Sequence, residues 1–183
     1  MIRRHARETV LQVLFQLDMS GEAEPEPILA RWAAEFSLAE ASQGFARELL
    51  LGTLANKAEI DVLLADLSEG WSLERMANVD RSILRLAAYE ILQRPDIPGR
   101  VSLNEAIELA KRFSGEESAK FINGILDRLL AASPKGVPTE KTAPLAAKTS
   151  TKGRKGNKSQ NGTLDVKHVH QTEDVETEGP SPN

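Results

Sequence analysis

The stretch SLNEAIELAKRFSGEESAKFINGILDRLLAA, residues 102–132, decides the fold class because apolar residues recur through it three and four positions apart. This spacing places them on one face of a helix. The pattern predicts helices near 103–113 and 116–132. The buried face of the second helix would consist of Ile122, Ile125, Leu126 and Leu129.

The same helical spacing continues toward the N-terminus, and no convincing alternation typical of strands interrupts it. We expect a helix near 3–19, a short one near 26–36 and one or two helices within 38–67. A turn near 73–77 would lead into a helix near 79–93. The fold class predicted from this pattern is all-α.

Three of these helices begin with the spacing of a capping box, in which a serine caps the helix and a glutamate three residues later bonds back to it. The expected pairs are Ser37 with Glu40, Ser102 with Glu105, and Ser114 with Glu117.

Composition changes abruptly at Pro134, which separates a helical domain over 1–133 from a tail over 134–183. The tail contains no aromatic residue, isoleucine or methionine, so it cannot bury enough apolar surface to offset the entropy of ordering. We therefore expect a disordered, low-complexity tail. Residues 1–133 carry a net charge of −6 and the tail carries +2.

The absence of cysteine excludes disulfides and thiolate metal sites, and it fits a reducing compartment. No apolar run approaches the length that spans a bilayer. The arginine-rich start lacks a small-residue cleavage site, and Glu8 and Asp18 argue against a transit peptide. We expect a cytoplasmic protein.

The opening MIRRHARETV places Arg3, Arg4 and Arg7 at the front of the first helix, where the helix dipole mildly disfavours cations. Guanidinium groups bind phosphate, and an aromatic ring can stack on an unpaired base. Phe15 lies close in angle to Arg4. The cluster fits a nucleic-acid surface, and the pattern alone favours the other interpretation, solvated arginines with Phe15 at the margin of the core.

The last helix carries a second candidate surface, where Phe121 stands about 90° from the buried stripe, beside Lys120 and Gly124. Glycine costs a helix interior about 1 kcal/mol relative to alanine, so Gly124 suggests close packing or a close partner. The alternative to a binding surface is a packing glycine with Phe121 at the core margin.

The middle segment NVDRSILRLAAYEIL, residues 78–92, predicts a core stripe around Ile83 and Leu86. Its charged residues Asp80, Arg81, Arg85 and Glu90 fall off that stripe. We expect a ladder of solvated ion pairs there, each contributing little to stability. An exposed acidic face is also usable by a basic partner protein.

No recognisable catalytic constellation or glycine-rich phosphate loop is present, so no catalytic residue or cofactor is expected. In the tail, His168 and His170 stand near Asp165 and Asp174. A segment without a second shell of supporting residues makes a poor metal site, and we expect no bound metal.

Three stretches, RRHARETVLQVLF, VDRSILRLAAYEIL and especially DIPGRVSLNEAIELAKRFSGEESAKFINGILDRL, resemble the NusB family of bacterial transcription antitermination factors. The resemblance covers residues 3–131. It implies about seven helices in two small helical bundles and a binding factor, not an enzyme. It also implies boxA RNA of ribosomal RNA operons as ligand, NusE (a small-subunit ribosomal protein) as partner, and an RNA polymerase complex with NusA and NusG.

Carried onto this sequence, the resemblance implies RNA contacts by Arg3, Arg4, Arg7, Lys120 and Phe121. It implies a NusE surface that includes Phe15, Glu74 and Asp80.

Two positions depart from the family pattern. His5 replaces a common arginine, which removes most of one charge at neutral pH. Phe15 stands where relatives often have tyrosine, so a hydroxyl is missing.

Two other functions compete with RNA binding. NusB-like domains also precede certain RNA methyltransferases, but such an enzyme needs a further α/β domain with a cofactor loop. Only 50 low-complexity residues follow the helices. A helical adaptor without RNA affinity is the remaining alternative.

Overall fold

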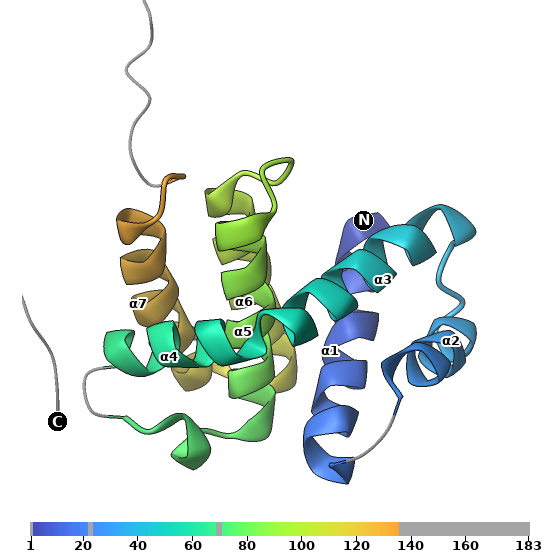
Figure 1. Cartoon of the computed structure of the whole chain (residues 1–183), viewed down its shortest axis with the longest axis horizontal. Helices are drawn as coiled ribbons and strands as arrows, with labels where there is room; N and C mark the ends of the chain where they lie inside the picture. The colour runs from blue at the N-terminus through green and yellow to red at the C-terminus, as the bar shows by residue number, and fades with distance from the viewer. Residues whose placement is uncertain (1, 22–23, 69–70, 136–183) are drawn as a thin grey trace, which may run out of the picture. The chain divides into compact units, whose positions relative to one another are not determined.

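The computed structural model describes residues 2–21, 24–68 and 71–135, and these form helices connected by short loops (Figure 1). The elements are α1 (Ile2–Ser20), α2 (Pro25–Glu35), α3 (Glu40–Ala55), α4 (Lys57–Leu67), the 3₁₀ turn η1 (Leu73–Arg75), α5 (Asn78–Gln93), α6 (Gly99–Phe113) and α7 (Glu116–Ala132). No strand occurs among the described residues. The predicted all-α class with seven helices is confirmed.

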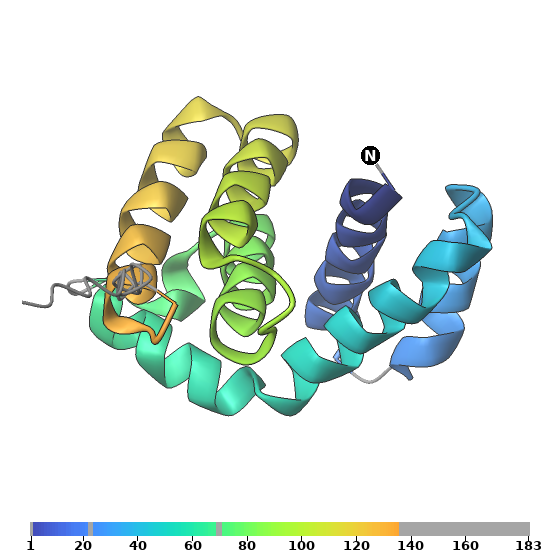
Figure 2. The same ribbon diagram turned by 90° about the horizontal axis from the view of Figure 1, so that it is seen from above.

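The helices form two groups, as Figure 2 shows: α1, α2 and α3 pack together, and α4 to α7 form the second bundle. The stretch 38–67 is two helices, because Asn56 ends α3 with its side-chain amide donating to the carbonyl of Gly52 at 2.8 Å. Helix α5 contacts both groups. It therefore joins the two bundles and carries the polar groups that connect them.

One continuous apolar core runs through the described part of the chain, built almost entirely from aliphatic side chains. The expected stripes of α5 and α7 are buried, with Ile83, Leu86, Ile122 and Ile125 each at most 2% exposed. Phenylalanine, tyrosine and tryptophan residues lie at its margin: Phe45, Tyr89 and Phe121 are only partly buried. Aromatic rings are thus available at the surface.

The three predicted capping boxes are wrong, since none of these helices has a side-chain capping hydrogen bond. Helix α6 begins at Gly99, directly after Pro98, so Ser102 lies inside the helix. Its hydroxyl instead donates to the buried carboxylate of Glu90 at 2.8 Å. A charged acceptor makes a strong hydrogen bond, and tertiary packing brings the Glu90 carboxylate within reach of Ser102. The caps of α3 and α7 are Ala39 and Gly115.

Residues 136–183 lie outside the described residues, and so do the four His and Asp residues considered for a metal. Pro134 and Lys135, which the composition assigns to the tail, are described. The Lys135 ammonium donates to the carbonyl oxygens of Glu90 at 2.6 Å and Ile97 at 2.9 Å, and also to that of Arg94. The folded part therefore continues through Lys135. Within the described segments, no helix is both long and apolar enough to cross a membrane.

Candidate nucleic-acid interface

The three N-terminal arginines of α1 face the junction of α5 and α6, and they are not equivalent. Arg7 is only 4% exposed and forms a two-pronged ion pair with Glu90, at 2.7 Å from Nε and 2.9 Å from Nη2. Glu90 is 1% exposed and also accepts the Ser102 hydroxyl. Arg7 is thus held inside the protein by a buried carboxylate, and each group balances the charge of the other away from water.

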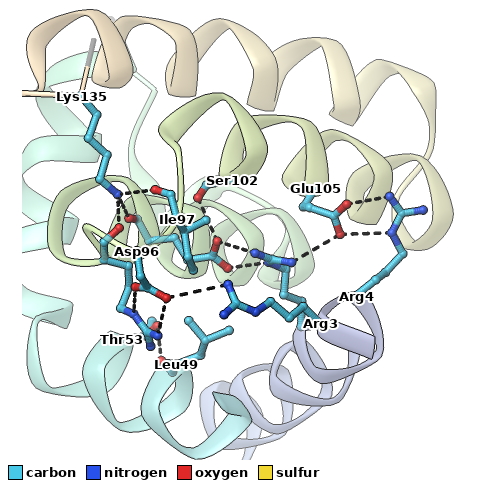
Figure 3. Close-up of polar contacts among 12 residues, drawn as sticks. Arg3, Arg4, Leu49, Thr53, Asp96, Ile97, Ser102, Glu105 and Lys135 are labelled. Carbon is cyan, nitrogen blue, oxygen red and sulfur yellow. Dashed lines mark hydrogen bonds and ion pairs between the residues drawn. The ribbon is translucent and has the colours of Figure 1, made fainter. Parts of the chain in front are cut away.

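Arg4 and Arg3 remain at the surface on the same corner (Figure 3). The Arg4 guanidinium donates to both carboxylate oxygens of Glu105, at 2.7 and 3.1 Å. This hydrogen bonding raises the pKa of Arg4 and lowers the pKa of Glu105. Arg3 is 3.8 Å from Asp96, and its guanidinium lies 4.9 Å from the centre of the Phe45 ring.

A surface hollow of about 510 Å³ opens beside these arginines, between the start of α1 and the start of α6. It is lined by Arg3, Arg4, His5, Arg7, Glu8, Ile97, Pro98, Val101, Glu105 and Arg112. The structure therefore brings the three predicted arginines to one place. The carboxylates of Glu105 and Asp96 neutralise part of their charge.

The charged residues of α5 are not the solvated ladder expected from the sequence, and that expectation is wrong. Asp80, Arg85 and Glu90 are each at most 8% exposed. Arg85 donates to Asp61 at 2.7 and 2.8 Å and to Asp18 at 3.1 Å. Burial favours a raised pKa at Asp18, but the bonds and charges of the neighbouring arginines outweigh it and lower the pKa. The helix is surrounded by other helices, so its polar side is also enclosed.

Phe121 and Asp80 line a second hollow, between α7 and the segment before α5. Its other lining residues are Trp71, Arg75, Met76, Ala77, Glu117 and Ser118. Trp71 is 60% exposed, and its ring centre lies 6.1 Å from that of Phe121. Sequence reasoning missed Trp71 because it lies in a loop, where no helical periodicity marks an outward-facing ring.

The other residues that the sequence singled out, on α7, η1 and α1, line neither hollow. Lys120 pairs with Glu117 at 2.7 Å at the surface of α7. Glu74 is exposed in η1 and accepts the Ser72 hydroxyl, which lowers the pKa of Glu74. Phe15 is half-buried on α1 and lines neither hollow. A Cβ added at Gly124 would meet nothing within 4 Å, so packing inside the chain does not explain this glycine.

The two hollows are separate places on the molecule. The first lies near Glu90 in the last part of α5, and the second lies near Asp80 in its first turn. Ten residues of helix span about 15 Å. A ligand that reaches both must be elongated, as a nucleic-acid strand is. Among the described residues, no cluster of histidine and acidic side chains could hold a metal ion.

The model of the NusB family matches residues 4–131. The chain is 63% identical over 131 residues to the transcription antitermination protein NusB of Desulfitobacterium hafniense, covering 71% of this chain and 88% of that protein. It is 50% identical to NusB of Desulforamulus reducens, covering 74% and 94%.

Among solved structures, T. maritima NusB aligns with a TM-score of 0.67 and 41% identity, covering 72% of this chain and 92% of that one. A structure of the antitermination factors NusB and NusE in complex with dsRNA aligns with a TM-score of 0.66 and 25% identity, covering 72% and 97%. The family match includes α2 to α6 in full and nearly all of α1 and α7. The chain therefore belongs to the NusB family, and it is a transcription antitermination factor and not an enzyme.

Proposed function

We propose that this protein binds the boxA segment of ribosomal RNA operon transcripts together with the ribosomal protein NusE. In this role it joins the RNA polymerase antitermination complex that contains NusA and NusG, and it works in the cytoplasm. The proposal rests on family membership and on one observation in this chain. Arg3 and Arg4 keep 57% and 46% of their side chains exposed beside a surface hollow.

The electrostatics of the arginine corner favour binding that is local and modest in strength. Residues 1–133 carry a net charge of −6, so the body of the protein repels phosphate while the corner attracts it. To bind a phosphate, Arg4 must also give up part of its hydrogen bonding to the Glu105 carboxylate. We therefore expect weak RNA binding by the protein alone and tighter binding when a basic partner adds its own contacts.

The proposed partner surface lies at the other end of α5. Glu74 is exposed there, and Asp80 lies in the neighbouring hollow, so a basic surface of NusE would meet carboxylates. Phe15 would contribute an apolar contact from α1. RNA contacts from Arg3 and Arg4 would lie at the arginine corner, and Phe121 would contact RNA beside Asp80, with which it lines the second hollow.

A binding titration of labelled boxA RNA, with and without NusE, tests this proposal. The double variant Arg3→Gln/Arg4→Gln should weaken binding and lower the salt slope by about 0.7 for each phosphate that the protein no longer neutralises. Arg7 is left unchanged because its removal would disturb the buried ion pair. The control Arg47→Gln/Lys57→Gln removes the same charge from exposed pairs elsewhere.

Equal affinity of the two double variants would contradict RNA binding by the corner. Such a result would favour a helical adaptor that acts through proteins alone, an alternative supported by the acidic partners already bound to Arg3 and Arg4. If NusE adds nothing to the affinity for boxA RNA, the proposed joint recognition fails.

A further inference from the structure

The loop between α5 and α6 places a carboxylate against the arginine corner. Asp96 lies in this loop, 3.8 Å from the Arg3 guanidinium, and the two side chains are 44% and 57% exposed. A carboxylate and a phosphate accept hydrogen bonds from the same guanidinium N–H groups. Asp96 therefore occupies a positive group that the proposed RNA contact requires.

Arg94 holds Asp96 from the other side. Its guanidinium donates to both carboxylate oxygens of Asp96, at 2.8 and 3.1 Å, and to Glu48 at 2.9 Å. The hydrogen bonds from Arg94 lower the pKa of Asp96, so this carboxyl stays ionised at neutral pH. The guanidinium carbons of Arg3 and Arg94 lie 4.9 and 5.4 Å from the centre of the same Phe45 ring. Asp96 thus bridges two cations that share one surface.

Lys135 fixes the loop that carries Asp96, as Figure 3 shows. Its ammonium has three N–H groups, and each donates to a backbone carbonyl: that of Glu90 at 2.6 Å, that of Ile97 at 2.9 Å and that of Arg94. These carbonyls lie in the last turn of α5 and in the loop, where the helix dipole favours a cation. Because this clamp holds the residues on both sides of Asp96, it limits how far the carboxylate can move from the arginine corner.

We infer that Asp96 is a built-in competitor of RNA at the arginine corner, and that Lys135 keeps it there by holding the α5–α6 loop. A phosphate that binds Arg3 must displace this carboxylate, so it gains less than at a free arginine. Removing the carboxylate therefore strengthens RNA binding, which is the opposite of what removing an RNA contact does. The inference rests on the proposed RNA-binding function and gives roles to Asp96 and Lys135 that this function does not include.

The variant Asp96→Asn of the full chain tests the competition in a titration of labelled boxA RNA without NusE. The variant should bind about fivefold more tightly than the wild type, the upper end of what one exposed ion pair contributes. Its salt slope should steepen by up to about 0.7, because Arg3 then neutralises a phosphate without releasing a carboxylate. The control Asp66→Asn removes an equal charge from an exposed position on α4 and should change affinity less than about 1.5-fold, because salt screens distant charges. Circular dichroism checks that each variant is folded.

A second pair of variants tests whether the competition is for Arg3. Arg3→Gln/Asp96→Asn should bind boxA RNA less than about twofold more tightly than Arg3→Gln, because the guanidinium for which Asp96 competes is gone.

Lys135→Met tests the clamp. It should tighten boxA binding about twofold, because the released loop lets Asp96 move away from the corner. The loss of one positive charge would by itself weaken RNA binding, so a gain in affinity cannot come from the charge. The control Lys111→Met removes the same charge from an exposed pair on α6 and should give no gain. In the Asp96→Asn background, Lys135→Met should also give no gain.

The inference is overturned if Asp96→Asn binds boxA RNA no more tightly than the wild type, if Asp66→Asn gives an equal gain, or if the gain persists in full without Arg3. The role of Lys135 fails if Lys135→Met weakens binding, or tightens it equally in Asp96→Asn. If boxA RNA binds with NusE but Asp96→Asn shows no gain, the proposed function stands and the inference fails. If the wild type with NusE binds boxA and a scrambled RNA equally, while Asp96→Asn tightens both, the proposed function fails and the competition remains.

Discussion

Replacing Glu90 with glutamine should destabilise the protein strongly, although the two side chains have nearly the same size. The carboxylate is 1% exposed and accepts three hydrogen bonds, two from Arg7 and one from Ser102. The amide of glutamine keeps one acceptor oxygen and turns the second position into a donor. At either position that donor would face an N–H of the Arg7 guanidinium, and at the Oε2 position it would also face the Ser102 hydroxyl.

The expected destabilisation follows from leaving a buried charge without its partner. Removing one member of a buried ion pair costs about 3–5 kcal/mol. We expect the lower end, about 3 kcal/mol, because Glu105 lies 3.6 Å from Arg7 and the glutamine oxygen still accepts at least one bond. A domain with about 5–15 kcal/mol of stability would lose a large share.

Urea denaturation at neutral pH measures this change in unfolding free energy, provided that the dependence on denaturant is unchanged. Glu108→Gln is the matched control, because Glu108 pairs with Lys111 at 3.7 Å and both side chains are more than 40% exposed. It should cost less than about 0.5 kcal/mol. A destabilisation below about 1 kcal/mol at Glu90 would refute the reasoning. The double variant Arg7→Met/Glu90→Leu should recover most of the stability, since an apolar pair leaves no buried charge.

Two further predictions concern the close approach at Gly52 and the acid dependence of folding. Gly52→Ala should lower the free energy of unfolding by about 1–3 kcal/mol, because the added Cβ would lie 2.0 Å from the Tyr89 ring. Adding Tyr89→Leu to this variant should restore stability, as measured by urea titration. The Arg4 hydrogen bond lowers the pKa of Glu105 below 4.5 in the folded protein. The Arg4–Glu105 pair therefore stabilises the folded state above pH 4.5, and this contribution disappears as the pH falls through the pKa of Glu105 in the folded protein. Unfolding free energies measured across this range should vary less in Arg4→Gln, and an unchanged pH dependence would contradict the pairing.

The helices were predictable because each one has an amphipathic pattern that can be read within a few turns. The expected stripe of α7 is buried from Ile122 to Leu129, and the break within 38–67 falls at Asn56. The helix starts were not predictable from serine and glutamate spacing. Helix α6 begins at Gly99, three residues before Ser102, and the Ser102 hydroxyl donates to Glu90, which lies 12 positions earlier in the chain.

In the candidate site, too, the local features were predictable from the sequence and the tertiary contacts were not. The arginines of α1 stand together in the sequence, and their common location follows directly from one helix. Their different surroundings do not: Arg7 is buried against α5, while Arg3 stays 57% exposed. Trp71 has no periodic pattern around it, so only the packing of α7 against the segment before α5 shows that it lies beside Phe121.

The all-helical class, the extent of most helices and the family could be predicted from the amino-acid sequence, because they depend on patterns that are local along the chain. Tertiary packing was needed to show which charges are buried and which residues line the same hollow, because burial and charge pairing depend on neighbours distant in sequence. Glu90 meets Arg7, 83 positions away, and Asp80 meets Ser118, 38 positions away, only once the helices have packed.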